Sequence, residues 1–114
     1  MTQHDDRVSL AQMLEFAEEA VDLAQGRVRE DLDSDRQFCL SILHLIQTVG
    51  EAARRVSELC RERHPQIGWL DIVGMRSRIV HAYDIIDLNL VWDTVQDDLP
   101  KLIGQLREIL GRPD

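Results

Sequence analysis

Residues 35–63 read DRQFCLSILHLIQTVGEAARRVSELCRER, and this stretch decides the fold. Apolar residues recur along it at intervals of three and four, the spacing that places them on one face of an α-helix. The pattern predicts one long helix over residues 35–63, with a bend near Gly50. Pro65 ends this helix, because proline has no backbone N–H and clashes with the preceding turn. The apolar positions are Phe38, Ile42, Leu45, Ile46, Val49, Ala52, Ala53, Val56, Leu59 and Cys60.

The stretch before it predicts a second amphipathic helix, from about Asp6 to Val28. Ser9 is a candidate cap for a later start, and Gly26 lowers the helix propensity near the end. Between the two helices, residues 31–35 read DLDSD, a turn rich in N-cap residues whose acids complement the positive end of a helix dipole. The apolar positions of this first helix are Leu10, Met13, Leu14, Ala17, Ala20, Val21 and Ala24.

Downstream, residues 64–68 form a short connection and residues 69–81 are predicted to be helical. Residues 84–87 form a turn in which Asp87 is a candidate N-cap, and a last helix runs over residues 88–110. Pro100 should kink or split that helix. The sequence Gly-Arg-Pro at residues 111–113 ends it.

These elements predict an all-α fold, an up-and-down helical bundle of four to five helices in a single domain over residues 1–114. Short connections favour antiparallel neighbours, which is why the bundle is expected to alternate in direction. A long apolar helix leaves surface for a partner, so a homodimer is the expected assembly.

The composition excludes several classes of protein. Apolar residues make up 44% of the 114, too many for a disordered chain, and no stretch approaches the roughly 20 apolar residues of a membrane span. Residues 1–7 are polar and acidic, unlike a targeting signal, so a cytoplasmic protein without a membrane partner is expected. On one continuous helix Cys39 and Cys60 would lie about 31 Å apart, too far for a disulfide.

The net charge of −8 argues against general affinity for nucleic acid, but the charges are unevenly distributed. Residues 54–81 hold six arginines against three acids, a net charge of +3, so the rest of the chain carries −11. A basic stretch in an acidic protein suggests a restricted site for an anionic ligand. The alternative is a solvated helix face with ordinary Glu–Arg pairs.

The chain has no glycine-rich phosphate loop, no H-E-x-x-H, no C-x-x-C pair and no G-x-S-x-G. His44, Gln47, Thr48 and Glu51 form one polar stripe along the predicted long helix. One histidine and one glutamate are too few for a metal site, so no metal and no cofactor are expected. The stripe is expected to meet solvent or a partner, and Glu51 is a candidate to support catalytic side chains on the 69–81 helix.

The segment that carries chemistry is Met75-Arg-Ser-Arg-Ile-Val-His-Ala-Tyr83. The imidazole of His81 can take and return a proton near neutral pH. An arginine is the natural clamp for phosphate, because its guanidinium is planar, always charged and able to donate two parallel hydrogen bonds. Together they are the minimum set for cleaving RNA without metal: the histidine deprotonates the 2′-hydroxyl or protonates the leaving 5′-oxygen, and the arginine stabilises charge on the phosphorus. The alternative is that an arginine and a histidine at a helix end have only a structural role.

The spacing leaves open which arginine serves. Arg76 and His81 are five residues apart, which separates them by about 140° around a straight helix. They converge only if the helix ends near His81 or if two protomers contribute to one cleft. Arg78 and His81 are three residues apart and share a face, so Arg78 competes with Arg76 for the phosphate.

At these residues the sequence resembles the HEPN superfamily and, within it, the HepT toxins, which carry an R-x4-H-x-Y motif, here Arg76 to Tyr83. The flanks add to the resemblance: Gly50-Glu51-Ala-Ala, His64-Pro65 followed by Trp69 and Gly74-Met75, Val91-Trp92, and Asp98-Leu99-Pro100. The similarity covers roughly residues 41–106. Many relatives have an amide or acid directly after the motif arginine, where this chain has Ser77.

The resemblance implies a homodimeric, metal-independent endoribonuclease in which Arg76 and His81 are catalytic and both copies of the motif line one cleft. Ser77 and Arg78 are then candidates for binding the RNA substrate. It also implies a partner, an MntA-like nucleotidyltransferase antitoxin that transfers AMP to Tyr83. AMP would block the cleft by its volume and by its phosphate charge.

The alternative function is a non-catalytic helical module that binds a nucleotidyltransferase partner. The acidic surface, the single basic stretch and Ser77 favour it. The pair of Arg76 and His81 favours the nuclease, since a scaffold would not need it.

Overall fold

The computed structural model describes residues 5–80 and 85–112. In these ranges the chain is helical apart from its turns and caps, and β-type pairing is limited to an isolated antiparallel bridge between Val80 and Ile86. The helices are α1 (Asp6–Leu23), α2 (Asp31–Ser34), α3 (Arg36–Arg54), α4 (Glu58–Arg63), α5 (Trp69–Val73), α6 (Met75–Ile79), α7 (Leu88–Asp93), the π-helical turn η2 (Thr94–Asp98) and α8 (Leu99–Leu110).

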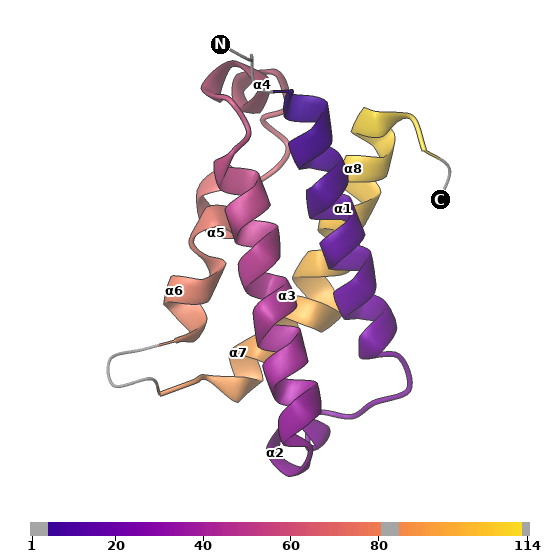
Figure 1. Ribbon diagram of the computed structural model, residues 1–114, viewed down its shortest axis with the longest axis vertical. Helices are drawn as coiled ribbons and strands as arrows, with labels where there is room; N and C mark the ends of the chain where they lie inside the picture. The colour runs from indigo at the N-terminus through magenta and orange to yellow at the C-terminus, as the bar shows by residue number, and fades with distance from the viewer. Residues whose placement is uncertain (1–4, 81–84, 113–114) are drawn as a thin grey trace.

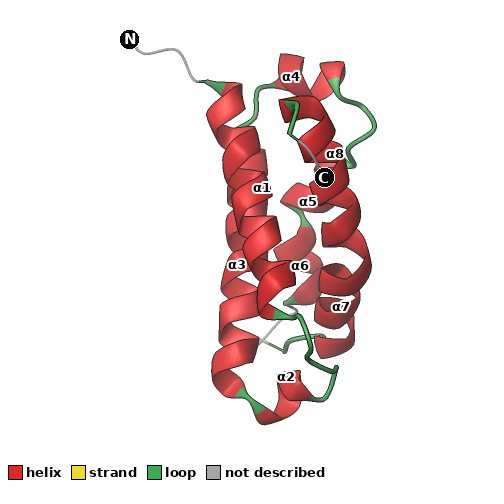
Figure 2. Ribbon diagram, turned by 90° about the vertical axis from the view of Figure 1, so that its right-hand side faces the viewer, coloured by secondary structure: helices red, strands yellow, loops and turns green. Residues whose placement is uncertain are grey.

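The predicted up-and-down bundle is confirmed. In Figure 1 the chain runs down α1, up α3, down α5 and α6, and up again through α7 to α8. Figure 2 shows α1 beside α3, and α8 continuing the line of α7. The apolar faces of α1, α3 and α8 form the core, with Met75 and Ile79 of α6 completing it. No helix within the described ranges is both long and apolar enough to cross a membrane.

The first helix begins as predicted and ends early. Its N-cap is Asp5, whose carboxylate accepts a hydrogen bond from the Arg7 amide, whereas Ser9 is buried inside the helix. The helix ends at Leu23 and not at Val28, because Gly26 adopts a left-handed φ of 77° in the turn that follows. Asp87 caps α7, as the sequence predicts. Asp35 caps α3, and the residues predicted as a turn before it form the short helix α2.

The prediction of one helix over residues 35–63 is wrong. Helix α3 continues through Gly50, and the helical chain breaks at residues 55–57. Ser57 then caps the new helix α4 with its hydroxyl. The carboxylate of Asp6 accepts bonds from the amide and hydroxyl of Ser57, 2.7 and 2.6 Å long, and pins the break against the start of α1. Local capping thus outweighs the continuing apolar period. Cys39 and Cys60 lie on different helices, so the separation of about 31 Å calculated for one continuous helix does not apply to them. Both are free thiols.

The other two predicted helices are also divided. The 69–81 helix breaks at Gly74 and ends at Ile79, because Val80 turns to extended backbone (φ −102°, ψ 110°) to pair with Ile86. The last helix passes through the wide turn η2 just before Pro100, which accommodates the missing proline N–H. It then ends at Gly111 in a left-handed C-cap, as predicted.

Candidate functional site

Helix α6 is short and is held to the bundle by two side chains. Met75 and Ile79, four residues apart, are each only 2% exposed and face the core. Arg76, Ser77 and Arg78 lie between them and are exposed. The motif arginine therefore projects from a helix whose position is fixed by apolar packing.

Arg76 and Ser77 line a pocket of about 210 Å³ between α3 and α6, called here the α3–α6 hollow. Arg54, Glu51 and Gln47 of α3 contribute the rest of its polar wall. The hollow thus joins the end of the long helix to the motif, two regions that are about 25 residues apart in the chain. Its remaining lining residues are Ile46, Gly50 and Val73.

Gly50 allows this approach. A Cβ at this position would lie 3.2 Å from the carbonyl oxygen of Ile72 and 3.6 Å from that of Val73, both on α5. The first distance is shorter than ordinary van der Waals contact, and backbone cannot swing away as a side chain can. Glycine therefore sets how closely α5, and with it α6, packs on α3.

The polar stripe of the long helix divides in the structure. Gln47 donates a 3.1 Å hydrogen bond to Glu51, and both enter the hollow. Thr48 donates to the carbonyl oxygen of Leu45, and His44 lies in a separate depression that includes Leu40. Within residues 5–80 and 85–112, no three His, Cys, Asp or Glu side chains are grouped closely enough to hold a metal ion.

The arginines of the basic stretch have three different roles. Arg61 donates to the carbonyl oxygens of Ala53, Arg54 and Val56, which caps the end of α3, and its guanidinium lies 5.8 Å from the Trp69 ring. Arg78 donates to the carbonyl oxygen of Asp71. Arg61 is therefore committed to the fold, and Arg78 uses one donor nitrogen for it.

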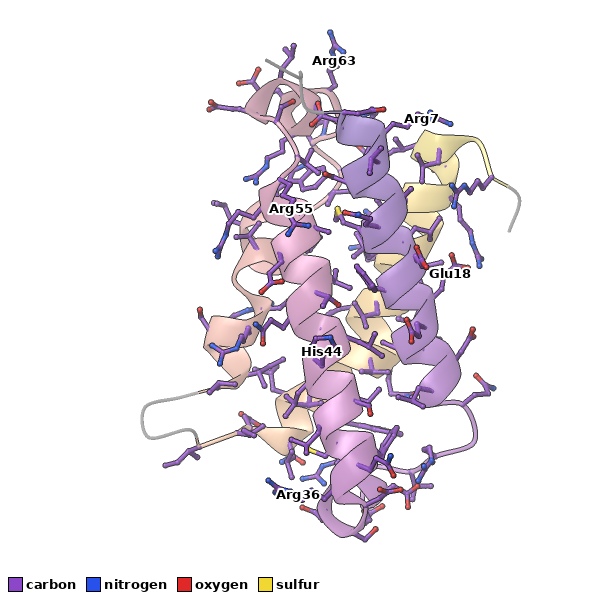
Figure 3. The ribbon with its side chains drawn as sticks, viewed as in Figure 1. Arg7, Glu18, Arg36, His44, Arg55 and Arg63 are labelled. Carbon is purple, nitrogen blue, oxygen red and sulfur yellow. The ribbon has the colours of Figure 1, made fainter. Side chains whose placement is uncertain are left out.

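Arg55 and Arg63 are exposed outside the hollow, and Figure 3 shows Arg63 at the α4 end of the bundle. Arg54 and Arg76 line the hollow. Neither of their guanidinium groups has a partner among the described residues, so both are available to an anion.

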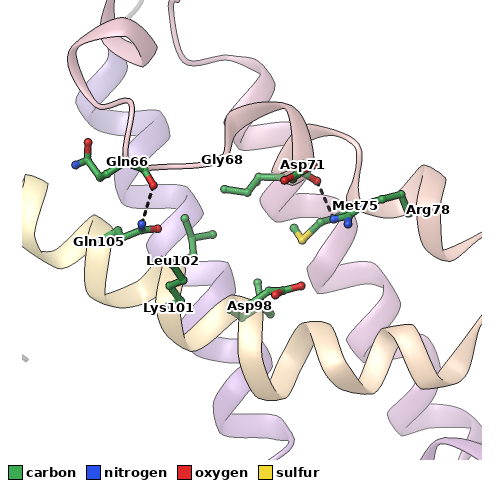
Figure 4. Close-up of a pocket in the computed structure, with 11 residues that line it drawn as sticks. Gln66, Gly68, Asp71, Met75, Arg78, Asp98, Lys101, Leu102 and Gln105 are labelled. Carbon is green, nitrogen blue, oxygen red and sulfur yellow. Dashed lines mark hydrogen bonds between the residues drawn. The ribbon is translucent and has the colours of Figure 1, made fainter.

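Arg78 lies on the other side of α6 from Arg76. It lines a groove between the α5–α6 segment and α8, together with Lys101 and Gln105 (Figure 4). Gln105 closes one end by donating a 2.9 Å hydrogen bond to the carbonyl oxygen of Gln66. Arg76 and Arg78 therefore serve different hollows and do not form one clamp.

Arg54 was not predicted as a site residue. Its signal was present, since Gln47, Glu51 and Arg54 follow the i, i+4, i+7 spacing of one helix face. The hollow is lined by two guanidinium groups, which suit a phosphate ligand, and by one carboxylate that accepts a hydrogen bond from an amide.

His81 and Tyr83, the other two motif residues, lie outside the described residues. The end of α6 nevertheless affects the predicted separation of Arg76 and His81 around the helix axis. Because α6 ends at Ile79, the 140° separation calculated for a straight helix does not apply to Arg76 and His81.

Comparison with known proteins gives a consistent result. The sequence model of the family described as "Ribonuclease HepT-like" matches residues 13–109. A "Probable ribonuclease HepT" of Thermococcus cleftensis is 29% identical over 100 residues, covering 84% of this chain and 91% of that protein. A "Putative RNase" of Caldanaerobacter subterraneus subsp. tengcongensis is 28% identical over 106 residues, covering 93% and 95%. No solved structure matches the chain significantly.

Proposed function

The chain belongs to the ribonuclease HepT-like family of the HEPN superfamily, and from this premise we propose that it is an endoribonuclease that cleaves RNA without a metal ion. The observation that carries the proposal is the state of Arg76. The motif arginine stands unpartnered among the described residues, on the wall of a hollow that suits a phosphate.

In the proposed reaction the 2′-oxygen of a ribose attacks the adjacent phosphorus and the bond to the 5′-oxygen breaks. The products are a 2′,3′-cyclic phosphate and a 5′-hydroxyl. Arg76 donates hydrogen bonds to the phosphoryl oxygens as negative charge develops on them. His81 takes the proton of the 2′-hydroxyl or gives one to the leaving 5′-oxygen.

The active assembly is proposed to be a homodimer in which two copies of the motif line one cleft. One imidazole cannot act in the same step as the base for the 2′-hydroxyl and as the acid for the leaving 5′-oxygen. A second copy of His81 in the same cleft would supply the complementary base or acid, and a second Arg76 would add positive charge.

The proposed cellular role is that of a cytoplasmic toxin neutralised by an MntA-like nucleotidyltransferase antitoxin. The hydroxyl oxygen of Tyr83 would attack the α-phosphorus of ATP and release pyrophosphate, which leaves AMP on the tyrosine. The added phosphate would repel the RNA backbone from a site that depends on Arg76. Partner and wild-type protein expressed together should yield a product heavier by one adenylyl group, and Tyr83→Phe should not gain it.

The function is tested by RNA cleavage in the presence of a metal chelator. Wild type should cut RNA, Arg76→Ala should lose about 100-fold or more, and His81→Ala about 100- to 10,000-fold. Arg63→Ala is the matched control, because it removes the same charge at the α4 end of the bundle. Cleavage that persists in His81→Ala would sink the assignment. Absence of cleavage by wild type, with a stable complex formed with the nucleotidyltransferase, would indicate the non-catalytic binding module.

A further inference from the structure

Arg54 shares the α3–α6 hollow with Arg76 and comes from the opposite wall. Its guanidinium, like that of Arg76, forms no hydrogen bond or ion pair with another described residue. Of the other arginines in the basic stretch, Arg61 binds three carbonyl oxygens and Arg78 binds one, whereas Arg55 and Arg63 lie outside the hollow. The hollow therefore gathers two cations whose hydrogen-bonding capacity the fold does not use.

The carboxylate in the hollow does not consume that capacity. Glu51 accepts its hydrogen bond from Gln47, 3.1 Å away, and neither arginine lies within ion-pair distance of it. Arg54 is the last residue of α3, where the negative end of the helix dipole favours a cation. Arg61 donates to the carbonyl oxygens of Ala53 and Arg54, so the backbone from which Arg54 projects is held in place.

The hollow has a volume of about 210 Å³ and carries one guanidinium on each of two walls, Arg76 on α6 and Arg54 on α3. A phosphate held by Arg76 on the α6 wall leaves the α3 wall open. On a chain with a net charge of −8, a second phosphate is bound only where a free cation meets it.

We propose that Arg54 binds the RNA phosphate next to the one that is cleaved, so that the α3–α6 hollow holds two consecutive phosphates. This inference rests on the proposed function, in which Arg76 acts at the scissile phosphate. Arg54 is then a substrate-positioning residue. It makes the enzyme favour chains with a phosphate flanking the cut over a bare dinucleotide.

The test compares three substrates: a dinucleotide with one phosphodiester, the same with a 5′-terminal phosphate, and the same with a 3′-terminal phosphate. For wild type, one of the two terminal phosphates should raise kcat/KM by about 10-fold or more, the worth of a hydrogen bond between charged groups. In Arg54→Ala that ratio should fall to about one, and Arg54→Lys should restore part of it. Arg55→Ala removes the same charge from the next residue, which lies outside the hollow, and should keep the wild-type ratio. A ratio within one variant does not depend on how much of the protein is folded.

Salt dependence gives an independent readout. Binding of single-stranded 2′-O-methyl RNA, which cannot be cleaved, is measured by fluorescence anisotropy over a range of salt concentrations. Losing one phosphate contact should lower the slope of log affinity against log salt by about 0.7 in Arg54→Ala and by nothing in Arg55→Ala.

The two proposals fail in different ways. If wild type cleaves RNA and Arg54→Ala keeps both the flanking-phosphate ratio and the salt slope, Arg54 is not a phosphate ligand, and the nuclease assignment stands. If wild type cleaves nothing, the proposed function fails, and the slope with 2′-O-methyl RNA still decides the role of Arg54. An unchanged slope overturns that role, and a slope lowered by about 0.7 supports it.

Discussion

Replacing Gly50 by alanine tests the packing that positions the candidate site, and the chain provides its own control. Gly50 and Gly104 both lie inside helices, in α3 and α8. A Cβ at Gly104 would meet nothing within 4 Å, whereas a Cβ at Gly50 would lie 3.2 Å from the carbonyl oxygen of Ile72. The two substitutions are chemically identical and differ only in their surroundings.

The expected magnitudes follow from these distances. Gly104→Ala should stabilise the protein by about 0.5–1 kcal/mol, because alanine has the higher helix propensity. For 114 residues the entropy of unfolding is about 240 cal/mol/K near 60 °C, so the melting temperature should rise by about 2–4 °C. Gly50→Ala gains the same propensity but must push α5 away by a few tenths of an ångström, and overpacking typically costs about 1–3 kcal/mol. It should therefore melt no higher than wild type.

The displacement should also reach the site. Ile72 and Val73 end α5 just before Arg76, so moving them shifts the α6 wall of the hollow. A shift of a few tenths of an ångström should lower RNA cleavage by about 3- to 10-fold, given that 1 Å can cost about 100-fold. Thermal melts by circular dichroism and cleavage rates are measured for both variants. If Gly50→Ala is stabilised as much as Gly104→Ala and cleaves like wild type, the close approach of α5 to α3 does not require glycine.

Three further predictions concern stability. Met75→Ala should destabilise the protein by about 2–5 kcal/mol in urea denaturation, because the Met75 side chain is only 2% exposed and its removal leaves a cavity under α6. A smaller loss of stability would mean that α6 does not depend on this side chain. Arg61→Ala should cost about 1–2 kcal/mol by the same measurement, since the end of α3 loses its side-chain cap, and an unchanged stability would argue that water replaces it. The hydrogen bond from the Phe38 amide holds the pKa of Asp35 below its usual value. The ionised Asp35 therefore stabilises the fold at pH values above the unfolded pKa of about 3.9, and this stabilisation is lost as the pH falls through the lower folded pKa. Asp35→Asn keeps a capping side chain and should flatten this acid limb; a pH profile of stability identical to wild type would contradict it.

The candidate site was only partly predictable from the sequence. Arg76 and Glu51 could be chosen from their chemistry and motif context, and both line the hollow. The basic stretch could be counted but its arginines could not be sorted. Arg61 is used to cap a helix end that the periodic pattern did not reveal, and Arg78 faces another groove. Arg54 became visible as a site residue only when α6 was placed against its helix.

The sequence by itself determined the helical class, the alternating bundle, the N-cap at Asp87 and the stop at Gly111. These depend on residue spacing and on side chains bonding to backbone a few residues away, which are local properties. Tertiary structure decided that the predicted helix over residues 35–63 breaks at residues 55–57, and which arginines remain unpartnered among the described residues. The break before Ser57 depends on the carboxylate of Asp6, 51 residues away in the chain. The pairing of helix faces depends on competing long-range contacts. An apolar pattern of period 3.6 shows which face of a helix is buried, but it does not show which other helix covers that face.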